Sequence, residues 1–170
     1  MPPGPRVDGP PNIVFIVVDD MGWKDVGFNG NTVYHTPNLD RLAAEGIVFT
    51  DAYSNSPVCA PSRASYLTGL YGPRHGVYTV GAEAQGRPDE RKVVPIDHDP
   101  ILASRFVTIA EALAPGGYVS AMIGKWHPDR VLATEQGFDF DIRTVDLGFG
   151  KHGSGYCKPI IDRLETECEG

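Results

Sequence analysis

The sequence lacks a long apolar run: none of its segments approaches the roughly 20 consecutive apolar residues that a membrane-spanning helix needs. Nothing in it therefore predicts a membrane span, and we expect no membrane partner. The first 11 residues are rich in proline and contain no apolar core, so they do not read as a secretory signal peptide. The sequence alone does not indicate a cellular location.

Basic residues are also in the minority. The chain has 15 Lys and Arg against 22 Asp and Glu, a formal net charge of -7, and no basic run. Nucleic-acid-binding proteins usually carry a clustered basic patch, so we expect no nucleic-acid partner. An anionic substrate would have to be attracted by a local group of cations, because the field of the whole chain repels it.

Cysteine is scarce as well. The three cysteines, Cys59, Cys157 and Cys168, are an odd number without metal-binding spacing, so a disulfide framework is not indicated. Whether Cys157 pairs with Cys168 stays open. The 170 residues, 41% hydrophobic and 22% charged, are typical of one globular domain, and the sequence contains no internal repeat.

The apolar segments that are present alternate with helical patterns. Residues 12–18 and 47–53 are rich in β-branched and aromatic residues and predict strands, the first buried on both faces. Between them, Thr36 and Pro37 begin a predicted helix that ends at Gly46. This alternation predicts an α/β fold with a mostly parallel sheet flanked by helices.

A second group of elements follows later in the chain. Thr108 and Glu111 have the spacing of a capping box at a helix start, and residues 118–123 predict a strand. Between residues 81 and 105 no period is convincing. The charged residues there are typical of a solvated loop.

The segment from Cys59 to Gly69 predicts a loop that enters a short helix. Pro61 suits the first turn and Gly69 the stop. Cys59 would then lie at a helix N-terminus, which favours negative charge, and Arg63 one turn further on would face the same side. This arrangement suits a tetrahedral oxyanion, although a lone cysteine is more often a small buried side chain.

Two other segments carry polar residues directly after predicted strands. Asp19 and Asp20 follow the first strand, and two carboxylates suit a hard cation such as Ca²⁺, although a solvated strand end is the plainer interpretation. Lys125 and His127 are two residues apart in an extended segment, so both face one side while Trp126 packs behind. Such a pair can clamp an oxyanion and donate a proton.

These segments together resemble the sulfatase family. Cys-Ala-Pro-Ser-Arg followed by Thr-Gly is similar to the signature in which the cysteine is oxidised to formylglycine, and Gly-Lys-Trp-His at residues 124–127 is similar to the second family motif. The likeness covers roughly residues 12–140. Pro128-Asp129 departs from the Leu-Gly usual after the second motif, which puts the following turn in doubt.

The resemblance implies an arylsulfatase-like sulfuric ester hydrolase, a member of the alkaline phosphatase superfamily. Cys59 would become formylglycine, whose hydrate attacks sulfur, and Asp19, Asp20 and residue 59 would bind one calcium ion. Arg63 and Lys125 would neutralise the anionic oxygens, and His127 would assist at the sulfate or the leaving oxygen. Implied partners are a sulfated small molecule or glycan and a formylglycine-generating or anaerobic sulfatase-maturing enzyme. Family members are often periplasmic, secreted or lysosomal.

The resemblance also sets an expected domain organisation. Residues 1–11 would be a Pro-rich leader, 12–156 the N-terminal part of a catalytic domain, and 157–170 an unassigned tail. The later metal ligands, His and Lys of complete sulfatases find no counterpart in the sequence. We therefore expect an incomplete sheet and little turnover by the isolated chain.

Two alternatives stay open. The first is a phosphoryl-transfer hydrolase of the alkaline phosphatase superfamily, which a Ser or Thr nucleophile would favour and Cys59 opposes. The second is a catalytically dead remnant that acts at most as a binding module. The sequence does not identify the sulfate ester.

Overall fold

The structure is a computed structural model, and it describes residues 9–81, 87–94, 96, 98, 100–126 and 131–143. The chain divides into two compact units, Met1–Ala52 and Tyr53–Gly170, and each is described by itself. Over the described ranges, no helix is both long and apolar enough to cross a membrane.

The first unit is built around a helix and a short 3-10 turn. Helix α1 (Pro37–Glu45) is flanked by Thr36 before its first residue and by Gly46 after its last, which confirms the predicted helix. Thr36 does not cap the helix with its side chain, because its hydroxyl accepts the Gly27 N–H at 2.8 Å. Asp40 of α1 accepts the Phe28 N–H, also at 2.8 Å, so two side chains tie η1 (Gly27–Asn29) to α1.

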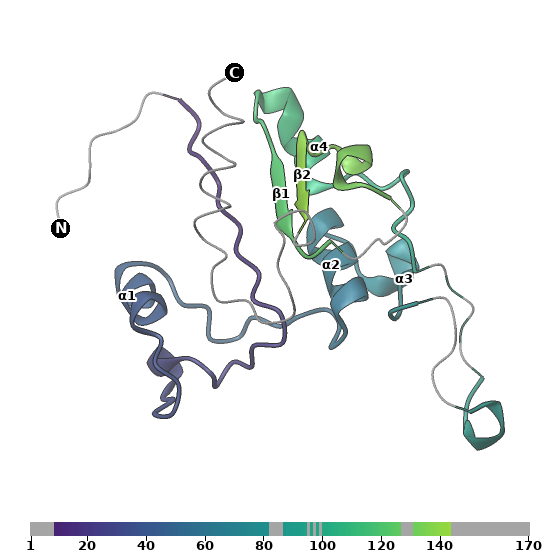
Figure 1. The fold of residues 1–170 in the computed structure, drawn as a ribbon, viewed down its shortest axis with the longest axis horizontal. Coiled ribbons are helices and arrows are strands. Elements are labelled where there is room, and N and C mark those ends of the chain that lie inside the picture. Colours follow the sequence, from purple (N-terminus) through teal and green to yellow (C-terminus); the bar gives the residue numbers. More distant parts are fainter. Residues whose placement is uncertain are drawn as a thin grey trace. The chain divides into compact units, whose positions relative to one another are not determined.

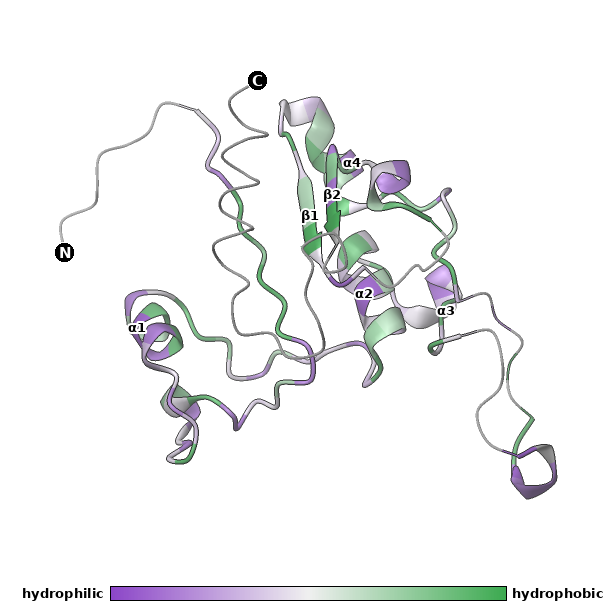
Figure 2. Cartoon of the chain, viewed as in Figure 1, coloured by the Kyte–Doolittle hydropathy of each residue, from purple (hydrophilic) through white to green (hydrophobic). Residues whose placement is uncertain are grey.

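The two strands predicted in this unit are wrong for this structure. Residues 12–18 are extended but do not form a strand, and their apolar side chains are exposed, from 41% for Val17 to 81% for Val14. Residues 47–53 are likewise irregular and exposed. Figure 2 shows the apolar character of the first segment. A strand needs a neighbour for its backbone hydrogen bonds, and in the described part of this unit no strand forms.

The second unit contains a two-stranded parallel sheet. Strand β1 (Ala121–Gly124) pairs with β2 (Phe140–Arg143) in the register Ala121↔Phe140 to Gly124↔Arg143 (Figure 1). The strand predicted at 118–123 is confirmed in place, although it begins and ends later. Asp139 accepts the Ser120 N–H at 2.7 Å, which joins the two chain segments just before the strands begin.

Short helices precede β1 in the sequence, and another lies between β1 and β2. Thr108 and Glu111 form the predicted capping box at the start of α4 (Ile109–Leu113), with each side chain bonded to the other residue's backbone N–H. The remaining elements of the unit are α2 (Cys59–Thr68), α3 (Gly72–His75), η2 (Pro88–Glu90), α4 (Ile109–Leu113), η3 (Ala114–Gly116) and η4 (Ala133–Gln136).

Helix α2 contributes to two apolar clusters. Ala60 and Ala64, one turn apart, pack with Val77 and Leu102. Leu67 packs with Trp126 and Ala133 in a second cluster, which Tyr66, Met122 and Phe138 border. Because α2 packs against apolar residues on two sides, the burial of these residues fixes its position relative to the end of β1.

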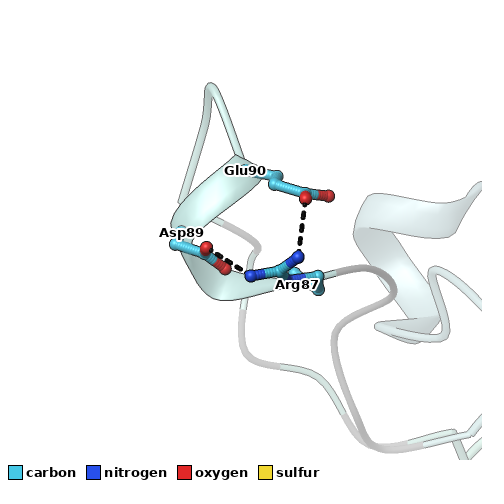
Figure 3. Close-up of polar contacts among 3 residues, drawn as sticks. All are labelled: Arg87, Asp89 and Glu90. Carbon is cyan, nitrogen blue, oxygen red and sulfur yellow. Dashed lines mark hydrogen bonds and ion pairs between the residues drawn. The ribbon is translucent and has the colours of Figure 1, made fainter.

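The solvated loop predicted from the charged residues is confirmed around η2. Arg87 reaches Asp89 at 2.9 Å and Glu90 at 3.1 Å, and all three side chains are more than half exposed (Figure 3). Exposed ion pairs of this kind contribute little to stability, typically under about 1 kcal/mol. The ion pairs of η2 therefore stabilise only this surface turn.

Candidate active site

Cys59 is the first residue of α2. The preceding Val58 is extended and supplies no side-chain cap, and the helix ends at Gly69, whose φ is 68°. Sequence reasoning placed Cys59 just ahead of the helix, and the structure places it on the first residue itself. Its side chain is half-buried. The thiol therefore lies where the helix dipole favours a negatively charged group.

Arg63 lies one turn after Cys59 on the same helix and is 6% exposed. Its Nη1 donates to the carbonyl oxygen of Lys125 and to the hydroxyl of Tyr66, the latter at 3.1 Å. A guanidinium is planar and permanently charged, so a buried one held by fixed acceptors offers a preorganised site for an anion. Both residues belong to α2, four positions apart, and their joint action on an anion stays a prediction.

Lys125 follows β1 directly. The chain turns at Gly124, whose φ of 99° few other residues adopt. The Lys125 side chain is exposed, whereas Trp126 is 7% exposed, donates to the Val131 carbonyl at 2.8 Å and packs edge-on against Phe138. Trp126 is packed as predicted, whereas the shared face of Lys125 and His127 stays a prediction because His127 lies outside the described residues.

Asp19 and Asp20 belong to the first unit and form a turn at the end of the extended segment. Asp20 has a φ of 57°, in the left-handed region that aspartate tolerates at some cost. This conformation breaks the alternation of side chains along an extended chain. Two consecutive carboxylates can then share one ion, as the prediction required.

The donor type of this pair fits calcium, because both groups are exposed hard oxygens on a chain turn. The number of donors is small. Calcium takes about six to eight oxygens, and within the described ranges no three His, Cys, Asp or Glu side chains gather at one point. Asp19 and Asp20 would hold only one side of such an ion.

A buried pair that sequence reasoning did not predict connects α2 with α3. Ser65 Oγ and His75 Nε2 are 3.0 Å apart, and both residues are 4% exposed. The Val77 N–H donates to His75 Nδ1 at 3.1 Å, so Nδ1 carries no proton and Nε2 donates to Ser65. In this tautomer His75 cannot act as a base toward Ser65. The pair joins α2 to α3 and does not form a serine nucleophile.

This pair predicts that stability depends on pH. Burial lowers the pKa of His75 below its ordinary 6.5. The unfolded chain then binds this proton more readily, so the contribution of His75 is complete above about pH 6.5 and falls as the pH drops below it. Urea unfolding at about pH 7.5 and about pH 5 should show the loss. A His75→Gln variant should show a smaller change, and an equal change in both proteins would contradict the assignment.

The family model and the relatives that match this chain belong to one protein family. A family model described as Sulfatase matches residues 11–147. N-acetylgalactosamine-6-sulfatase of Mus musculus is 44% identical over 155 residues, which cover 89% of this chain and 29% of that protein. Arylsulfatase A of Homo sapiens is 44% identical over 173 residues, covering 98% of this chain and 31% of that protein.

Solved structures give a similar result. The crystal structure of Ps i-CgsB matches with a TM-score of 0.60 and 28% identity over 91% of this chain and 32% of that one. The chain therefore spans less than a third of the proteins it matches. These neighbours and the parallel pairing of β1 with β2 confirm the predicted α/β fold class.

Proposed function

Because this chain belongs to the sulfatase family, we propose that it carries the nucleophile and the anion-binding residues of a sulfuric ester hydrolase. The observation that carries the proposal is that Cys59 is the first residue of α2 and that the buried Arg63 follows one turn later. A helix N-terminus and a fixed guanidinium are both suited to a sulfate group.

The reaction would split an ester R–O–SO₃⁻ with water into R–OH, sulfate and a proton. Formylglycine made from Cys59 would supply the attacking oxygen. Arg63 would bind sulfate oxygens in a fixed plane, and the exposed ammonium of Lys125 would add a second positive charge. His127 would assist at the sulfate or at the leaving oxygen. The modification requires a formylglycine-generating or anaerobic sulfatase-maturing enzyme as a partner.

A calcium ion is part of the proposal. Asp19 and Asp20 would hold it, together with the modified residue 59, and when bound it would polarise the sulfate. Removal of calcium with a chelator should then weaken the binding of inorganic sulfate. The donor type and the turn at Asp20 support this part of the proposal.

The substrate class we propose is a sulfated glycan or a sulfated small molecule. Two kinds of relative support it, since one is named for a sulfated sugar and another for aryl sulfates. The cationic residues Arg63 and Lys125 match the charge of such a group. They do not distinguish one ester from another.

The test is to produce the protein with and without a sulfatase-maturing enzyme and to measure residue 59 and turnover together. We expect an aldehyde at residue 59 by peptide mass only after co-expression. Only that form should release product from an aryl sulfate when protein is in excess over substrate. Absence of the aldehyde, or equal release by both preparations, would refute the proposal. Preferential cleavage of the matching aryl phosphate would favour a phosphoryl-transfer enzyme instead.

A further inference from the structure

Arg63 is held by two oxygen atoms of different origin. One is the backbone carbonyl of Lys125, at the end of β1, and the other is the phenolic oxygen of Tyr66, three residues further along α2. Both accept from the same nitrogen, Nη1. Because a guanidinium is rigid and planar, two acceptors on one nitrogen set the direction of the whole group.

Tyr66 is itself held in place by packing. It borders the cluster formed by Leu67, Trp126 and Ala133, so its aromatic ring rests on residues that are 7% exposed or less. A phenol has only two side-chain torsions, and packing of the ring leaves its oxygen little freedom. The acceptor that Tyr66 offers to Arg63 is therefore nearly as fixed as the backbone carbonyl.

We propose that Tyr66 is a positioning residue, which orients the Arg63 guanidinium toward the sulfate group. This inference rests on the proposed function. Tyr66 acts through Arg63 and is not a catalytic residue. The residue also connects the apolar cluster behind the sheet with the anion-binding face of α2, so a change in the packing of Trp126 would reach Arg63 through it.

The test compares Tyr66→Phe with Tyr71→Phe. The first variant removes the hydroxyl and keeps the packed ring, while the second removes a hydroxyl from a side chain that is 69% exposed. In the ligand-free modified protein, we expect Tyr66→Phe to speed the rotation of the Arg63 guanidinium, measured by ¹⁵N NMR of the arginine side chain. The melting temperature should stay close to that of the wild type, because the half-buried ring and its packing are unchanged.

The functional arm measures aryl sulfate turnover and inhibition by inorganic sulfate. Tyr66→Phe should lower the single-turnover rate of sulfate release about tenfold and weaken sulfate inhibition, because a misdirected guanidinium binds the reacting group less well. Tyr71→Phe should change neither. Unchanged guanidinium rotation, or unchanged turnover in an active protein, would overturn the role of Tyr66.

The experiments distinguish a failure of the proposed function from a failure of the role of Tyr66. A wild-type protein that carries the aldehyde but neither hydrolyses aryl sulfates nor binds inorganic sulfate would overturn the proposed function, and the role of Tyr66 with it. An active wild type with a fully active Tyr66→Phe variant would overturn the role of Tyr66 alone. If Tyr66→Phe lowers both the activity and the melting temperature, Tyr66 acts through packing and not through the orientation of Arg63.

Discussion

A Cys59→Ala variant should release no sulfate from an aryl sulfate, a loss of about 10³-fold or more. Alanine cannot be converted to the aldehyde and offers no nucleophilic atom. The substitution should leave the fold intact, because residue 59 is half-buried at the start of α2 and alanine favours helix. Product release under single-turnover conditions and peptide mass at residue 59 measure the two consequences together.

The control for this experiment is Thr68→Ser at the other end of the same helix. Thr68 Oγ1 bonds to the Ala64 carbonyl, and serine keeps that bond, so turnover should be that of the wild type. If Cys59→Ala still releases sulfate, the nucleophile lies elsewhere in the protein. The tautomer of His75 makes Ser65 a poor candidate for that role.

Gly137→Ala should destabilise the second unit by about 3 kcal/mol, which is a large part of the stability of a small domain. Gly137 has a φ of 86°, where a Cβ costs about 1–2 kcal/mol. The added Cβ would also overlap Glu111 Cγ and lie 3.1 Å from the Glu111 backbone nitrogen. The clash involves backbone and the capping-box side chain, so it cannot be relieved by a simple rotation. Urea unfolding measures the difference.

Gly117→Ala separates the two causes. Its φ of 78° resembles that of Gly137, but a Cβ there would meet nothing within 4 Å. This variant should lose only the backbone contribution, about 1–2 kcal/mol. If both variants lose the same stability, the contact between Gly137 and Glu111 has no energetic weight.

Elements with local causes were predictable from the sequence. Helix α1 follows from Pro37 near its start and Gly46 after its end, and the capping box of Thr108 and Glu111 follows from their spacing. The burial of Trp126 behind Lys125 follows from alternation along an extended chain. Each of these depends on residues a few positions apart, which a pattern can represent.

The strands at 12–18 and 47–53 were predicted wrongly for this structure because a strand depends on its neighbours. Apolar β-branched residues describe a segment that is able to pair, and they do not supply the second strand. The placement of Cys59 and Arg63 one turn apart on a helix could be predicted from their spacing. The contact of Arg63 with Tyr66 required the position of the ring against Trp126 and Ala133, which no spacing reveals.

The bond from Arg63 to the carbonyl of Lys125 has a consequence for how this site tolerates sequence change. The acceptor belongs to the peptide group, and every amino acid at position 125 presents the same oxygen. The charge contributed by residue 125 can therefore vary without disturbing the anchor of Arg63. Substitutions at position 125 can therefore change the charge there and still leave the geometry of Arg63 intact.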